Sequence, residues 1–251
     1  MISIKNKISV AKMERAGLLL QEVFDDISSF IKEDVSTLDI DTKIAQLLKE
    51  KNLTSKALGY RGYKHVSCIS VNDVVVHGIP TASQILCEGD LVKVDICASY
   101  DGYCADMARA YFIGKPKPEV EKLVAVAESA LKKGIEKARV GNRLGDISAA
   151  IQTEVEKHGF GVVRDFAGHG IGKQMHEDPE ILNYGKPGQG PLLQAGMTFA
   201  IEPMITQGNY KVYVAEDGWT VKTLDKSLAA HVEDTIAITA DEPKVLTRSK
   251  R

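Results

Sequence analysis

The sequence predicts an α+β fold in which helices back a mostly antiparallel sheet. Helical and strand-forming segments alternate in blocks, with two helices and then strands in each half of the chain. The turn dipeptide at 101–102, Asp-Gly, separates two strand-forming runs and predicts an antiparallel hairpin. No linker interrupts the chain, because the Gly/Pro stretch at 185–191 has the length of a surface loop. We therefore expect one domain over 1–251, with pseudo-twofold halves at about 8–114 and 116–239.

The first half begins with two predicted helices. Apolar residues recur at helical spacing over 9–34, and a second helix is expected to start at the capping residues Ser36 and Thr37. From 65 to 114 the chain is rich in Val, Ile and Tyr and is punctuated by turn residues. This composition is typical of strands.

The second half repeats this order. Helical spacing of apolar residues returns over 118–139 and over 146–158. Strands are expected at 197–206, 219–223 and 231–239, where β-branched and aromatic residues gather. The two halves share an architecture but no visible sequence repeat.

Charge and hydropathy exclude several classes of protein. The 251 residues include 32 Lys and Arg against 34 Asp and Glu, which gives a net charge of −2. This balance argues against DNA or RNA as the main partner, because phosphate binding needs a concentrated positive face. No apolar run approaches the ~20 residues of a membrane span, and the first ten residues carry no apolar signal segment. We expect a cytoplasmic protein that does not enter a membrane.

The four cysteines, Cys68, Cys87, Cys97 and Cys104, form neither a Cys-x-x-Cys pair nor a zinc-ribbon pattern. We expect reduced, partly buried thiols, as in most intracellular proteins.

Two aspartates are expected to converge on one face of the hairpin. If the loop holds two residues, Cys97 lies opposite Asp106, and Asp95 is the neighbour of Cys97 on the same face. Asp95 and Asp106 then become diagonal neighbours, with Cβ atoms somewhat under ~7–8 Å apart. Two such carboxylates either face water or share a cation, and the hairpin alone leaves both explanations open.

Three more ligand-type side chains lie in unusual surroundings. His169 belongs to a Gly-His-Gly-Ile-Gly string at 168–172, and its glycines allow unusual backbone angles and a close approach to a ligand. Lys173 breaks the Gly-x-Gly-x-x-Gly fingerprint, so we discard a nucleotide-binding loop. Glu202 and Glu233 each lie within an apolar strand, where an unpaired carboxylate costs several kcal/mol.

The four carboxylates of Asp95, Asp106, Glu202 and Glu233 need a nearby positive charge to neutralise them if they are buried together. The runs around Glu202 and Glu233 contain no lysine or arginine, although His231 shares a strand face with Glu233. Two divalent cations would balance four carboxylates, with His169 as a neutral ligand. A set of oxygen ligands with one imidazole favours ions such as Mn, Fe or Co over a sulfur-rich zinc site. A pair of such ions can activate a water near neutral pH.

The order of these residues resembles the type I methionine aminopeptidases, which have the pita-bread metallopeptidase fold. No long helical insertion lies between His176 and Glu202, which is typical of the short, type I form of the family. The resemblance extends over about 8–239 and is carried by the five ligand positions and by short strings: Tyr-Arg-Gly-Tyr at 60–63, His-Gly-Ile-Pro at 77–80, Gly-His-Gly-Ile-Gly at 168–172, Ile-Glu-Pro-Met at 201–204 and Asp-Gly-Trp-Thr at 217–220.

The resemblance implies a ligand set for two divalent ions, which could be Co, Mn, Fe or Zn. Asp95 would bind one ion, and His169 and Glu202 would bind the other. Asp106 and Glu233 would bridge the two ions. Cys97 faces the same site and is expected to support the ligands or to be an oxidisable thiol.

The resemblance also implies catalytic and substrate-binding residues. His77 would hydrogen-bond the scissile amide, His176 would hold the carbonyl oxygen, and Glu202 would shuttle a proton. Besides the two histidines, the methionine pocket would be lined by Tyr60, Tyr63, Cys68, Met175 and Trp219. Aromatic and sulfur groups suit a thioether, although ordinary packing is the alternative for each of them. Met175 replaces an aromatic residue that is common in relatives, which affects the expected pocket width.

The implied activity is removal of the initiator methionine from new polypeptides whose second residue is small. A proline-directed peptidase of the same fold and a non-catalytic pita-bread binding module are the alternatives. We expect a monomer that acts on N-terminal Met peptides and nascent chains and contacts the ribosome transiently. The basic tail at 243–251 could make that contact or could be a solvated, frayed end.

Overall fold

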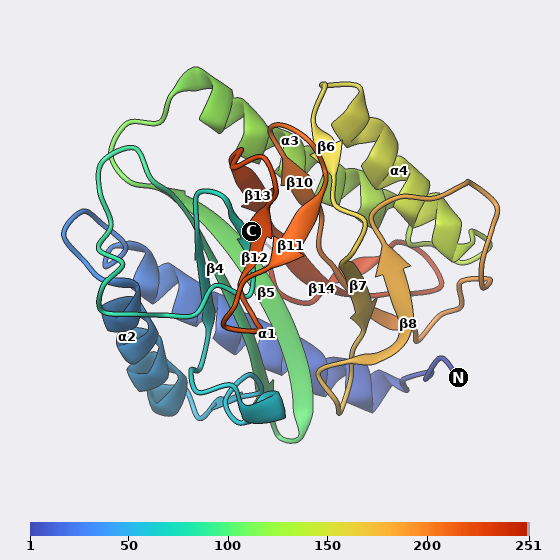
Figure 1. The fold of residues 1–251 in the computed structure, drawn as a ribbon. Helices are drawn as coiled ribbons and strands as arrows, with labels where there is room; N and C mark the ends of the chain where they lie inside the picture. Colours follow the sequence, from blue (N-terminus) through green and yellow to red (C-terminus); the bar gives the residue numbers. More distant parts are fainter. Residues whose placement is uncertain (250–251) are drawn as a thin grey trace.

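The computed structural model describes residues 1–249, and its helices surround a strongly curved central sheet (Figure 1). The helices are α1 (Lys7–Ser28), α2 (Thr37–Glu50), α3 (Pro118–Lys137) and α4 (Leu144–Glu156), with a short 3-10 turn η1 (Tyr60–Gly62). All four predicted helices are confirmed. The first ends at Ser28 rather than near position 34.

The main sheet joins strands from both halves of the chain. Its order is β1 (Thr54–Ser55), β4 (Leu91–Tyr100), β5 (Tyr103–Phe112), β14 (Glu233–Ala237), β9 (Thr198–Ile201), β7 (Ala167–Gly170) and β8 (Glu177–Leu182), with β2 (Cys68–Val71) also on β4 and β15 (Lys244–Val245) also on β14. Two small sheets flank it: β13 (Ala229–His231), β10 (Met204–Thr206) and β6 (Gly161–Val162) form one, and β11 (Val212–Val214), β12 (Val221–Thr223) and β3 (Val74–Val76) form the other. Every ladder in residues 1–249 is antiparallel.

Two of the helices begin at residues that favour a helix N-terminus. Ser36 caps α2 and forms a capping box with Asp39, so that each side chain accepts a hydrogen bond from the other residue's backbone N–H. Pro118 starts α3 at a position where its missing N–H costs nothing. α1 packs on β4 and β5, and α2 packs on α1, β1 and β2. In the second half α3 packs against β9, β10, β13 and β14, and α4 packs on α3, β6 and β8.

The β4–β5 hairpin has the predicted register. Tyr100 pairs with Tyr103 across a two-residue loop, and Cys97 pairs with Asp106. Residues at alternate positions, such as Val94 and Ile96, pack into the core under α1 and α2. The intervening residues Lys93, Asp95 and Cys97 therefore face the opposite side of the sheet.

Two predicted strands are broken. The expected strand 197–206 is split into β9 and β10, because Pro203 has no N–H to continue a ladder. The expected strand 231–239 is likewise split into β13 and β14 at Val232. In both cases the chain leaves one sheet and joins another. The third expected strand, 219–223, is confirmed in part as β12.

The C-terminal segment is packed as far as it is described, which differs from a frayed end. Leu246 and Thr247 are fully buried, and Lys244 forms an ion pair with Glu14 of α1. The last two residues lie outside the described part of the chain. None of the helices in residues 1–249 has the combination of length and hydrophobicity that a bilayer crossing requires.

Candidate active site

A cavity of about 960 Å³ lies on the face of the sheet away from α1 and α2. Its wall contains side chains from both halves of the chain. They include every residue predicted for the site: Tyr60, Tyr63, Cys68, His77, Asp95, Asp106, His169, Met175, His176, Glu202, Trp219 and Glu233. Residues spread over most of the sequence thus meet at one place.

The hairpin contributes the two aspartates as its register predicts. Asp95 lies opposite Ala108 and Asp106 opposite Cys97, so the carboxylates are diagonal neighbours on the cavity face. Cys97 also lines the cavity, as expected, and all four thiols are free. Cys68 pairs with Asp95 from β2, which places a predicted pocket residue beside a predicted ligand.

His169 is held between two close strands, and this explains its glycines. A Cβ on Gly168 would lie 2.4 Å from the carbonyl oxygen of Ala200, and one on Gly170 would lie 2.0 Å from that of Asp178. Neither glycine has a positive φ. The glycines therefore allow close approach of neighbouring strands, and the expectation of unusual backbone angles near a ligand was wrong.

Glu202 and Glu233 lie beside the two strand breaks. Glu202 follows the end of β9, and Glu233 is the first residue of β14. The next residue, Asp234, points the other way and forms ion pairs with Arg109 and Arg248. The arginines near this strand thus neutralise Asp234. Within residues 1–249, no lysine or arginine forms an ion pair with any of the four cavity carboxylates.

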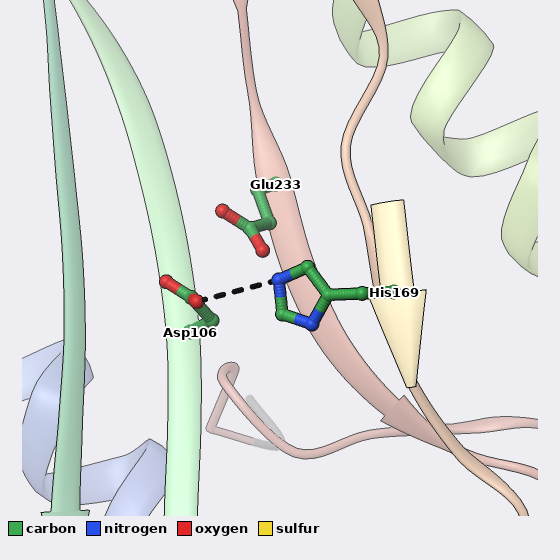
Figure 2. A group of neighbouring side chains, drawn as sticks. All are labelled: Asp106, His169 and Glu233. Atoms are coloured by element: carbon green, nitrogen blue, oxygen red, sulfur yellow. Dashed lines mark ion pairs between the residues drawn. The ribbon is translucent and has the colours of Figure 1, made fainter. Parts of the chain in front are cut away.

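Figure 2 shows the carboxylates of Asp106 and Glu233 next to the imidazole of His169, with Asp106 facing one of its ring nitrogens. Nδ1 of His169 lies 2.9 Å from the carbonyl oxygen of Gly170, which can only accept, so the ring proton is on Nδ1 and Nε2 carries a lone pair. This Nε2 is 3.7 Å from Oδ2 of Asp106 and 3.6 Å from Oε1 of Glu202. One nitrogen of His169, Asp106 and Glu233 could bind the same ion.

Burial and mutual repulsion raise the pKa values of these acids. Burial, followed by the charge of Glu202, raises the pKa of Asp106 to about 7. Burial also raises the pKa values of Asp95, Glu202 and Glu233 well above the usual range, and nearby carboxylates add to the effect at Asp95 and Glu233. Oε1 of Glu233 is buried without a hydrogen-bond partner among the described residues.

This set of side chains fits a divalent cation. Lone pairs of a neutral imidazole and of two carboxylates face one another at 3.6–3.7 Å, which is unfavourable unless a positive ion lies between them. The buried Oε1 of Glu233, which has no hydrogen-bond partner among the described residues, would likewise be stabilised by a nearby cation. The ligand types, several carboxylate oxygens and one imidazole, suit Mn, Fe or Co.

We expect the apparent affinity for Mn²⁺ to increase with pH between about pH 5 and 8. In the metal-free protein the raised carboxyl pKa values keep protons on the ligands, and an ion must displace them. Each displaced proton makes the affinity change by about tenfold per pH unit. Burial lowers the pKa of His169 to about 3, so this imidazole is already neutral and adds nothing. Calorimetry in two buffers of different ionisation enthalpy counts the protons; a pH-independent affinity without proton release would contradict this account.

Two more histidines line the cavity with distinct geometry. His77 has a positive φ of 59°, a strained conformation for a non-glycine residue, and its ring lies edge-on to Phe166. Burial lowers its pKa to about 4, so it is neutral. His176 lies with its ring 4.5 Å from that of His169, and its Nδ1 is 3.2 Å from the hydroxyl of Tyr60.

Two of the predicted pocket residues, Tyr63 and Trp219, form an aromatic pair in the cavity wall. The rings of Tyr63 and Trp219 lie 5.0 Å apart, and the Tyr63 hydroxyl donates to the carbonyl of Ser67. Asp41 of α2 holds this segment by accepting hydrogen bonds from the backbone N–H and the hydroxyl of Ser67. The sequence had no signal for this support, because it depends on a contact between distant segments.

Sequence reasoning missed two buried groups at the site. His231 is 1% exposed, and its Nε2 lies 3.3 Å from Oε2 of Glu202. Its alternation with Glu233 was visible in the sequence, but that pattern gave it no role at the site. Lys93, also 1% exposed, lies two residues before Asp95 and donates to the carbonyl of Asn72. Burial lowers the pKa of Lys93 to about 7.

Comparison with known proteins places these features in a family. Residues 11–240 match the profile of metallopeptidase family M24. The chain is 46% identical to a methionine aminopeptidase of Clostridium acetobutylicum, over 98% of this chain and 99% of that protein.

Solved structures give the same relationship. A crystal structure of methionine aminopeptidase from Thermotoga maritima covers 99% of this chain and 100% of its own, with 42% identity and a TM-score of 0.97. The prolidase of Pyrococcus furiosus has a TM-score of 0.78 at 24% identity, over 99% of this chain and 66% of its own, and shares the fold alone.

Proposed function

Because this chain belongs to metallopeptidase family M24 and to its methionine aminopeptidases, we propose that the cavity described above is its active site. The protein is a metal-dependent aminopeptidase with the pita-bread fold that removes N-terminal methionine. The observation that carries the assignment of the site is the convergence of Asp106, Glu202 and the bare nitrogen of His169.

Two divalent ions are held by the cavity carboxylates in this proposal. Asp95 would hold one ion, His169 and Glu202 would hold the other, and Asp106 and Glu233 would be shared between the two. When bound, the ions supply Lewis-acid chemistry, polarising the substrate carbonyl and lowering the pKa of a water. Four negative charges without a lysine or arginine partner support a total charge of about four plus at this site.

The side chains of the chain supply the proton transfers and the hydrogen bonds. Glu202 would take a proton from the attacking water and pass it to the leaving amine, as a positioned general acid–base group. If the Tyr60 hydroxyl donates to Nδ1 of His176, Nε2 of that ring carries the proton and can donate to the carbonyl oxygen of the substrate. His77, neutral at pH 7, contacts the scissile amide.

The side chain of the substrate's N-terminal methionine binds in a pocket lined by Tyr60, Tyr63, Cys68, Met175 and Trp219. Aromatic rings and sulfur atoms contact a polarisable thioether favourably. Crowding beyond the scissile bond selects a small second residue, because a large side chain meets the cavity wall. Met175 is unbranched and has several rotatable bonds, a side chain that adapts to irregular gaps, so it suits a pocket that must fit a substrate side chain.

We expect His77→Ala to lower kcat by about 10²–10³-fold, as for the loss of one hydrogen bond to the transition state. Its binding of Mn²⁺ should be nearly unchanged, because His77 is not among the proposed ligands. Steady-state kinetics and calorimetric titration with Mn²⁺ check the two parts separately. Loss of metal binding in this variant would show that His77 has a different role.

The function is tested with peptides and added metal. Protein treated with a chelator and then supplied with Mn, Co or Fe should cleave Met-Ala-Ser and leave Xaa-Pro peptides intact. Preference for Xaa-Pro peptides would indicate a proline-directed peptidase. No turnover with any of the metals would indicate a binding module.

The proposal extends to the oligomeric state of the enzyme, its location in the cell and its contact with the ribosome. A single catalytic domain over 1–251, acting as a monomer on nascent chains in the cytoplasm, fits the removal of an initiator methionine. A contact between the tail at 243–251 and ribosomal RNA would compete with two ion pairs, Lys244 with Glu14 and Arg248 with Asp234. Co-sedimentation with ribosomes at increasing salt tests this contact.

A further inference from the structure

Glu202 lies between two imidazoles that approach different oxygens of its carboxylate. Oε1 of Glu202 is 3.6 Å from Nε2 of His169, and Oε2 is 3.3 Å from Nε2 of His231. His231 is the last residue of β13 and pairs with Met204 of β10, which starts two residues after Glu202. The β10–β13 ladder therefore fixes the separation of His231 and Glu202.

The Nε2 atom of His231 is buried and has no hydrogen-bond partner among the described residues. The residue is 1% exposed, and its Nε2 makes no hydrogen bond of standard geometry with any described residue. A buried ring nitrogen without a partner is destabilising. A carboxylate oxygen of Glu202 lies 3.3 Å from this nitrogen, so the distance allows a hydrogen bond and only a small rotation of either side chain is needed to align the N–H with the oxygen.

Both histidines face Glu202 with Nε2, but they differ in which ring nitrogen carries the proton. Nδ1 of His169 donates to Gly170, so that the ring offers a lone pair to the site. A carboxylate oxygen next to Nε2 of His231 favours the tautomer with the proton on that nitrogen. The buried lysine on the same side of the sheet does not compete for Glu202, because Lys93 donates to the carbonyl of Asn72.

We propose that His231 is a positioning residue, whose Nε2–H donates to Oε2 of Glu202 and leaves Oε1 for the ion shared with His169. This inference rests on the proposed function, which assigns Glu202 to the metal. Hydrogen bonds from outside the ligand set are a general means of orienting a ligand and setting its basicity. Here the bond decides which oxygen of Glu202 binds metal and which remains for the proton.

The test compares two substitutions of His231. Glutamine keeps an N–H donor at a similar distance from the backbone, whereas leucine has a similar size and no donor. We expect His231→Leu to weaken Mn²⁺ binding by about 10–100-fold. We expect His231→Gln to retain the affinity within a few-fold and to keep the visible absorption spectrum of the Co²⁺-loaded protein. His158→Gln, two residues beyond the end of α4 and with a half-buried side chain, is the matched control and should change neither property.

The possible outcomes separate this inference from the proposed function. Wild-type affinity in His231→Leu would overturn the inference. An equal loss in both variants, with a changed Co²⁺ spectrum in His231→Gln, would make His231 a direct ligand and would also overturn it. If His231→Leu does not fold, His231→Asn, whose amide is too short to reach Glu202, replaces it. Failure of the wild-type protein to bind metal or to cleave Met-Ala-Ser would instead contradict the proposed function.

Discussion

Replacing Glu202 by glutamine should reduce kcat by at least about 10²–10⁴-fold, the range typical for loss of a general acid–base group. The amide has the size of the carboxylate, so the cavity keeps its shape, but it cannot take up and release a proton. Its oxygen can still approach an ion, although with a weaker charge. The loss should therefore be larger in kcat than in the number of ions bound.

Three measurements separate catalysis from folding in this variant. Turnover of Met-Ala-Ser reports the chemistry, thermal unfolding reports the fold, and elemental analysis of anaerobically purified protein reports the metal. Glu156→Gln, at the exposed end of α4, is a matched control that should behave like the wild type. Turnover of Glu202→Gln near the wild-type rate would remove Glu202 from the mechanism.

The hairpin at the site was predictable because its information is local. An Asp-Gly loop of two residues fixes the register, and the register fixes the face on which Asp95 and Asp106 lie. The α+β class was predictable for a similar reason, since each helix has its own apolar face and end signals. The alternation also explains why Val94 and Ile96 pack under the helices while Asp95 faces the cavity.

The strand breaks were not predictable from local patterns. The apolar runs around Glu202 and Glu233 read as continuous strands, but each passes from one sheet into another at the break. Whether a strand continues depends on which partner lies beside it, and this is decided by segments distant in sequence. Only Pro203 gave a local hint. The same limit applies to Asp234, whose arginine partners come from β5 and from the C-terminal segment.

The glycines around His169 illustrate a second limit. Their presence predicted a special backbone, and the structure gives the reason as close contact with Ala200 and Asp178. A sequence cannot distinguish close packing from a positive φ, since glycine serves both purposes. The role of Asp41 in holding Ser67 was hidden for a related reason: a buried acid on a helix has no partner in its own segment.

Replacing Asp106 by asparagine should have opposite effects on the metal-free and the metal-loaded protein. Without metal, the charge of Asp106 opposes folding, because burial and Glu202 raise its pKa to about 7. A carboxyl whose pKa is raised in the folded state binds its proton more tightly there than when unfolded. Its contribution to stability therefore falls as the pH rises from about 4 through about 7.

The asparagine variant should thus unfold at a higher temperature than the wild type in chelator at about pH 8, by roughly 1–4 kcal/mol in free energy. At about pH 5 the aspartate is largely protonated, and the difference should shrink. Excess Mn²⁺ at the higher pH should reverse the order, because only the wild type keeps both of the carboxylates that we propose to be shared between the ions, and the variant should lose at least about 10²-fold in activity. Thermal unfolding under these three conditions provides the comparison. Lower stability of the metal-free variant at about pH 8 would mean that the Asp106 charge is already compensated within the chain, and the case for a cation between these acids would lose its physical basis.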